Sequence, residues 1–196
     1  MRLSSSRSFL FLLSLVFGLS AVAAAQQSSV RTVFLVRHAE RASAAPDSLL
    51  SPAGQKRAEC LARTLRDAGI KQIFITDVKR TEQTATPLAA AMKLKPTVIP
   101  AKDPNTLIRD IAYGAQGNVL VVGHSDTLPF VLARLKAGTI TIGENQYDQL
   151  FVVNITDGVA SPVTTLHYCD CGAAGATPTP AATHKPTSSK KRMKRP

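Results

Sequence analysis

Short apolar segments alternate with helix-like segments between residues 30 and 170. Val30–Val36, Gln72–Thr76 and Val119–Val122 are apolar or β-branched almost throughout, without a polar residue at every second position. Strands without a polar face are typical of parallel sheets that helices cover on both sides. The sequence therefore predicts an α/β fold of three layers, with a mostly parallel central sheet between two layers of helices.

The segment Ser51–Ala68 shows the clearest helix signals. Ser51 is a suitable N-cap, Pro52 fits the first helical position, and Gly69 can end the helix. Further helices are predicted over Thr81–Met92, which contains Pro87, over Pro104–Tyr113 and over Asp126–Lys136. Further strands are predicted over Pro96–Ile99, Gln149–Ile155 and Val163–Leu166.

Residues 1–25 have the pattern of a secretory signal peptide. Arg2 and Arg7 precede an apolar stretch from Phe9 to Leu19, and the small residues 21–25 follow it. The stretch is short for a membrane span of ~20 residues, although an uncleaved anchor is the alternative. We therefore expect a secreted or periplasmic protein, with a folded domain over 26–172 and no transmembrane segment after cleavage.

Residues 173–196 are rich in Ala, Thr, Pro and Ser and contain six of the 24 Lys and Arg residues but no acid. They lack the apolar residues that offset the entropy of ordering, so a disordered basic tail is predicted. Much of the formal charge of +11 therefore lies outside the domain, which argues against a dedicated nucleic-acid site. The tail could contact anionic envelope polymers weakly, or be a solvated segment with no partner.

The chain contains three cysteines, Cys60, Cys169 and Cys171. In an exported protein, one disulfide and one free thiol are the simplest arrangement. Cys60 could pair with Cys169 or Cys171, and a strained Cys169–Cys171 bridge is the third alternative. No cysteine or histidine pattern has metal-ligand spacing, so neither a metal nor another cofactor is expected.

Basic and imidazole side chains follow three of the predicted strands. The first strand runs into Arg37 and His38, the second into a turn that carries Arg80, and the strand at 119–122 into His124. The carboxyl ends of parallel strands lie at one edge of a sheet, where ligands bind in such folds. Each residue alone fits an ordinary turn or helix start, so the prediction of a site depends on the whole set.

These side chains suit phosphoryl transfer. A neutral imidazole can attack phosphorus, and the planar guanidinium group of arginine binds oxyanions in pairs of hydrogen bonds. Cationic surroundings also keep a histidine neutral at pH values where an isolated one, with a pKa of about 6.5, begins to protonate. A small phosphorylated molecule is therefore the expected substrate.

Four motifs, in order, resemble those of the histidine phosphatase (phosphoglycerate mutase-like) superfamily. They are Val36-Arg37-His38-Ala39-Glu40, Leu50-Ser51-Pro52-Ala53-Gly54, Arg80-Thr81-Glu82-Gln83-Thr84-Ala85 and Val122-Gly123-His124-Ser125. The resemblance covers about residues 33–135. Long insertions that would cap a sugar-phosphate site have no room here, so the chain looks like the small, lidless branch that includes phosphohistidine phosphatases.

The resemblance implies a role for each matching residue. His38 would be the phosphorylated nucleophile, and His124 would stabilise the transferring group. Arg37 and Arg80 would hold the phosphate, with weaker contributions from Arg41 and Ser125.

The general acid is the main departure from the pattern. Members of this superfamily often supply a glutamate after the third strand, but no glutamate lies between Glu82 and Glu144. Asp103 is the best-placed carboxylate, although Asp before Pro is also a common turn pair. Asp126, Glu40 or no dedicated acid are the alternatives, and without an acid good leaving groups would be preferred.

Two functions follow from these observations. The first is an exported, metal-independent phosphatase that hydrolyses phosphomonoesters through a phosphohistidine. The alternative is a module that binds a phosphorylated envelope ligand with little or no turnover.

Overall fold

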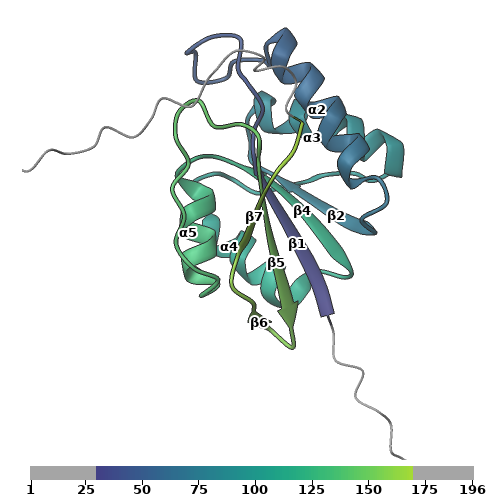
Figure 1. Ribbon diagram of the computed structural model, residues 1–196, viewed down its shortest axis with the longest axis vertical. Coiled ribbons are helices and arrows are strands. Elements are labelled where there is room, and N and C mark those ends of the chain that lie inside the picture. Colours follow the sequence, from purple (N-terminus) through teal and green to yellow (C-terminus); the bar gives the residue numbers. More distant parts are fainter. Residues whose placement is uncertain (1–29, 170–196) are drawn as a thin grey trace, which may run out of the picture.

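A seven-stranded sheet forms the centre of the molecule in the computed structural model, which describes residues 30–169. The strand order is β3-β2-β4-β1-β5-β6, and β7 pairs with β5. Figure 1 shows β2, β4, β1 and β5 side by side in this order. The parallel part consists of β1 (Val30–Arg37), β2 (Ile70–Ile75), β3 (Thr97–Val98) and β4 (Asn118–Gly123). The predicted signal peptide and basic tail lie outside the described residues.

Antiparallel strands complete the sheet beside β1. They are β5 (Gln149–Thr156), β6 (Val159–Ala160) and β7 (Thr164–His167). Along its length β5 pairs with β1, from Val30 opposite Thr156 to Val36 opposite Leu150. The N-terminal end of β5 therefore lies at the same sheet edge as the C-terminal end of β1.

Helices cover both faces of the sheet, with α2 and α3 on one side and α4 and α5 on the other (Figure 1). Successive residues of β4 face opposite sides, as in any strand. Val119 and Val121 join the core under α4 and α5, whereas Leu120 and Val122 join the core under α2 and α3. The predicted three-layer α/β fold is thereby confirmed. The helices are α2 (Pro52–Leu65), α3 (Lys79–Met92), α4 (Pro104–Arg109) and α5 (Thr127–Arg134).

The start of α2 lies against the loop that follows β1. Ser51 caps the helix by accepting a hydrogen bond from the Gly54 amide at 3.1 Å, as its sequence position predicts. A Cβ atom on Gly54 would lie 2.2 Å from the Glu40 carbonyl oxygen, so only glycine permits this approach. The helix thus fixes the backbone two residues after His38.

The predicted helix 104–113 is interrupted. α4 ends at Arg109, and a wider π-helical turn, η1 (Asp110–Gly114), follows. The buried Arg31 guanidinium donates to the carbonyls of Ile111 (3.2 Å) and Ala115 (2.7 Å). These bonds from β1 satisfy carbonyls at the wide turn, and helix periodicity alone cannot predict such a long-range effect.

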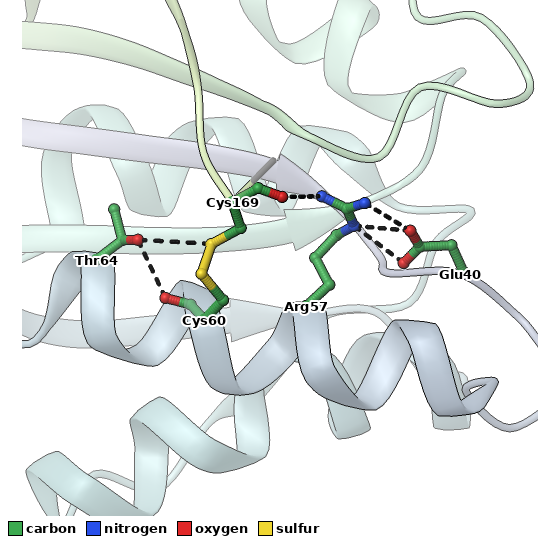
Figure 2. Close-up of a disulfide and its surroundings, with 5 residues drawn as sticks. All are labelled: Glu40, Arg57, Cys60, Thr64 and Cys169. Atoms are coloured by element: carbon green, nitrogen blue, oxygen red, sulfur yellow. Dashed lines mark hydrogen bonds and ion pairs between the residues drawn. A yellow bond between two sulfur atoms is a disulfide. The ribbon is translucent and has the colours of Figure 1, made fainter. Parts of the chain in front are cut away.

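One of the three predicted disulfide pairings is present, between Cys60 on α2 and Cys169 after β7, with the Cα atoms 6.1 Å apart. Figure 2 shows Arg57 between this bridge and the loop after β1. Arg57 donates to the Cys169 carbonyl at 3.2 Å and forms an ion pair with Glu40 at 2.7 Å. The disulfide therefore fastens the end of the described chain to the helix that supports the β1 loop.

No helix within residues 30–169 combines the length and apolar character that a membrane span requires.

Candidate active site

The carboxyl ends of β1, β2 and β4 meet at one edge of the sheet, because the three strands are parallel neighbours. The His38 amide donates to the Gly123 carbonyl at 2.9 Å, which joins the two histidine-bearing ends directly. A cleft of about 720 Å³ opens there. The residues that line it are Arg37, His38, Arg41, Ser43, Ala44, Val78, Arg80, Ala101, His124, Ser125, Asp126, Glu144, Asn145 and Tyr147.

His38 is buried, with 4% of its surface exposed. Its Nδ1 lies 2.8 Å from the Ala39 carbonyl oxygen. A carbonyl can only accept, so Nδ1 carries the proton and Nε2 of the neutral ring has a free lone pair. Burial is the main cause that lowers the pKa of His38 from 6.5 to about 4, with His124, Arg80 and Arg37 adding to it against the hydrogen bond to Ala39. The ring is therefore neutral at pH 7.

The His124 ring stands edge-on to His38, with the ring centroids 5.3 Å apart. Its Nε2 lies 2.9 Å from Thr76 Oγ1, and its Nδ1 lies 3.5 Å from an Arg80 nitrogen. Burial, followed by the charge of Arg80, lowers the pKa of His124 from 6.5 to about 4. Two neutral imidazoles thus share the cleft.

Arg37 is held by backbone carbonyls of the loop before β5. One terminal nitrogen donates to Gly143 and Glu144, each at 2.8 Å, and the guanidinium lies 4.3 Å from the centroid of the Tyr147 ring. Its Nε is buried and has no hydrogen-bond partner among the described residues. The loop fixes the guanidinium through one terminal nitrogen and leaves the buried Nε–H without an acceptor among the described residues.

Arg80 is arranged in a similar way. One terminal nitrogen donates to the Pro46 carbonyl, the other faces His124, and Nε is buried without a partner in the described part of the chain. Buried N–H groups without acceptors are rare, because each costs ~1–3 kcal/mol. Two arginine side chains and two neutral histidines that line the same cleft indicate a site for an oxyanion.

The three carboxylates considered from the sequence lie in different places. Asp103 caps α4, accepting from the Thr106 amide at 3.2 Å and its hydroxyl at 2.7 Å, and does not line the cleft. Glu40 is engaged by Arg57, with Nε donating at 2.8 Å, and is also outside the cleft lining. Asp126 caps α5, accepting from the Thr127 amide at 2.7 Å, and lines the cleft. The structure therefore does not bring Asp103 to the histidines, because helix capping holds its side chain elsewhere.

Arg41 and Ser125 line the cleft, as do several residues that sequence reasoning missed. Glu144, Asn145 and Tyr147 come from the loop before β5, and Tyr147 lies 6.2 Å from His38 between ring centroids. No motif marks this loop. An antiparallel placement of the strand 149–155 would have pointed to it, because the start of that strand then lies beside the end of the first one.

Within residues 30–169, no group of three or more His, Cys, Asp or Glu side chains is arranged to hold a metal ion. The donors in the cleft are arginines and histidines, whose charge and hydrogen bonds suit a small anion.

The fold and the cleft together define a three-layer α/β protein with an oxyanion site at the carboxyl edge of its sheet. The sequence profile of the histidine phosphatase superfamily (branch 1) matches residues 33–101, which include His38 and Arg80. The resemblance to this superfamily that the motifs predict is thereby confirmed. The match supports phosphatase activity.

Solved structures share the fold. The protein histidine phosphatase SixA complexed with tungstate aligns with a TM-score of 0.59 at 19% identity, over 69% of this chain and 96% of that one. A putative α-ribazole-5′-phosphate phosphatase from Escherichia coli aligns with a TM-score of 0.59 at 15% identity, over 71% and 97%. A mycobacterial glucosyl-3-phosphoglycerate phosphatase aligns with a TM-score of 0.54 at 13% identity, over 71% and 99%. No curated protein matches the chain in sequence.

Proposed function

We propose that this protein is a phosphatase that hydrolyses small phosphomonoesters through a phosphohistidine at His38, without a metal ion. The observation that carries the proposal is the shared cleft in which the Arg37 and Arg80 side chains lie close to His38, whose Nε2 is unprotonated. A phosphate group accepts hydrogen bonds from guanidinium groups, and in this cleft it brings phosphorus to the nucleophile.

The reaction proceeds in two steps. Nε2 of His38 attacks phosphorus, the P–O bond to the leaving group breaks, and the departing oxygen takes a proton. Water then attacks the phosphohistidine and gives a proton back to the group that protonated the leaving oxygen, the P–N bond breaks, and inorganic phosphate leaves. Arg37 and Arg80 stabilise the charge on the transferring group, and their positions are fixed in advance by backbone carbonyls.

Asp126 is our proposed source of the proton for the leaving group. It lines the cleft, and its negative charge opposes the lowering of the pKa of both His124 and Arg80, which indicates that it lies near them. Glu144 also lines the cleft, from the loop before β5.

Export is also part of the proposal. The Cys60–Cys169 disulfide supports it, because disulfides persist in oxidising compartments and are rare in the cytosol. The amino-terminal pattern that first suggested export lies outside the described residues.

The direct test is hydrolysis of p-nitrophenyl phosphate by the purified protein in excess EDTA. We expect turnover that EDTA does not reduce and that inorganic tungstate or vanadate inhibits competitively, because these oxyanions fit the same donors. A panel of aryl, sugar and inositol phosphates and a phosphohistidine peptide then ranks the substrates. Binding of oxyanions without hydrolysis of any ester would contradict the enzyme and favour the binding module.

Asp126→Asn is expected to separate substrates by leaving group. Turnover of an alkyl phosphate should fall about a hundredfold, because its leaving oxygen needs a proton, whereas p-nitrophenyl phosphate should lose little. Steady-state kcat on both substrates measures this. Asp103→Asn is the matched control and should lower neither rate. Equal losses on both substrates for Asp126→Asn would show that Asp126 is not the acid.

A further inference from the structure

Two buried threonines connect His124 to the backbone after β2. Thr76 is 6% exposed and Thr81 is fully buried. Thr76 Oγ1 lies 2.9 Å from His124 Nε2 and 3.1 Å from Thr81 Oγ1. Neither threonine holds the phosphate in the mechanism above. These hydrogen bonds therefore need another explanation.

The hydrogen bonds of Thr81 determine which atom donates in each of the hydrogen bonds between His124, Thr76 and Thr81. The Thr81 hydroxyl lies within donating distance of two backbone carbonyls, those of Thr76 (2.9 Å) and Val78 (2.8 Å), which compete for its single proton. Because its one proton is used there, the Thr81 oxygen can only accept from Thr76. The Thr76 hydroxyl proton therefore points to Thr81, and the Thr76 oxygen accepts from His124, so Nε2 carries a proton.

The other side of the imidazole agrees with this direction. An Arg80 nitrogen, which can only donate, lies 3.5 Å from Nδ1 of His124. With the proton on Nε2, Nδ1 is an acceptor facing this donor. In the opposite tautomer of neutral His124, the N–H of Nδ1 would face the donating nitrogen of Arg80. Thr76 would then donate to His124, and the Thr81 oxygen would lose the proton that it accepts from Thr76.

We propose that Thr76, anchored through Thr81, is a positioning residue that keeps the proton of neutral His124 on Nε2 and reserves Nδ1 for proton exchange in the cleft. The two catalytic histidines then have opposite tautomers, since the Ala39 carbonyl holds the proton of His38 on Nδ1. When a phosphoryl group is bound, its negative charge favours a second proton on His124, and only Nδ1 can receive it. In the imidazolium Nδ1 no longer accepts from Arg80, so this N–H and the Arg80 nitrogen both donate to oxygens of the bound phosphoryl group.

The tautomer itself can be tested without any substrate, although its use in turnover rests on the proposed function. Long-range ¹H–¹⁵N spectra of the full chain, labelled at histidine, distinguish protonated from unprotonated ring nitrogens, and His38→Ala and His124→Ala identify the signals. At pH 7 we expect His124 protonated at Nε2 and His38 protonated at Nδ1. Addition of inorganic tungstate should add a proton signal at Nδ1 of His124. A His124 ring protonated at Nδ1 alone in the free protein would overturn the proposal.

Variants test the role of the hydroxyl. Thr76→Val removes the acceptor with almost no change in shape, and we expect kcat to fall about tenfold with KM nearly constant, the loss typical of one buried hydrogen bond. Its His124 signals should change, and Thr76→Ser should restore both the signals and most of the turnover. Thr86→Val is the matched control, because the exposed Thr86 hydroxyl donates to the Glu82 carbonyl within α3, away from His124. A folded Thr76→Val protein with wild-type His124 signals and kcat would refute the role of Thr76. Absence of any phosphatase activity, with the expected tautomers present, would count against the proposed function alone.

Discussion

Replacing His38 with alanine is expected to lower kcat for p-nitrophenyl phosphate by on the order of 10⁴–10⁶-fold, the range seen when a nucleophile is removed. The variant has no other nucleophile at the position of the lost imidazole. In His124, Nδ1 faces Arg80 and Nε2 is hydrogen-bonded to Thr76. Steady-state assays at high enzyme concentration measure the residual rate. Rapid-quench assays should show a burst with the wild-type protein and none with the variant.

His167→Ala is the matched control for this loss. His167 is exposed and paired with Asp148 at 2.6 Å, and it does not line the cleft. Its removal should leave kcat unaltered. The His38→Ala protein should still bind tungstate, because Arg37 and Arg80 are held by backbone carbonyls that the substitution does not touch. Wild-type turnover by His38→Ala would exclude the phosphohistidine.

Local patterns determine much of this fold. The runs around Leu35, Ile73 and Val121 are buried on both faces, and such runs specify strands whatever their partners. Segments shaped by distant contacts were harder to predict. The break after Arg109 accompanies hydrogen bonds from Arg31, 80 or more residues away in sequence, and β6 is a pair of residues defined only by its pairing with β5.

The candidate site divides in the same way. Residues that directly follow parallel strands, such as His38 and His124, could be located from the sequence, because topology alone brings them to one edge. Tyr147 reaches the cleft from the antiparallel side, and the role of Thr76 appears only in the hydrogen-bond geometry. Asp103 illustrates the converse, since its position before Pro104 favoured helix capping over chemistry.

The largest expected effect on stability is loss of the Cys60–Cys169 disulfide. The bridge spans 109 positions of sequence, and closing a loop of ~100 residues restricts the unfolded chain by about 4.7 kcal/mol in the chain-entropy picture. Removal of a native disulfide typically costs ~2–5 kcal/mol. For a domain of this size we expect the Tm of a Cys60→Ser/Cys169→Ser protein to fall by roughly 5–20 °C.

Thermal melts with and without a reducing agent isolate the cause. Reductant should lower the Tm of the wild-type protein to that of the double variant and leave the variant itself unaffected. Cys171→Ser retains the pair and should respond like the wild-type protein. Activity well below the Tm should survive in the double variant, because Arg57 still pairs with Glu40 and neither cysteine lines the cleft. A folded double variant that has lost turnover would instead mean that the bridge, through the Cys169 carbonyl and Arg57, holds the loop of His38 in its active position.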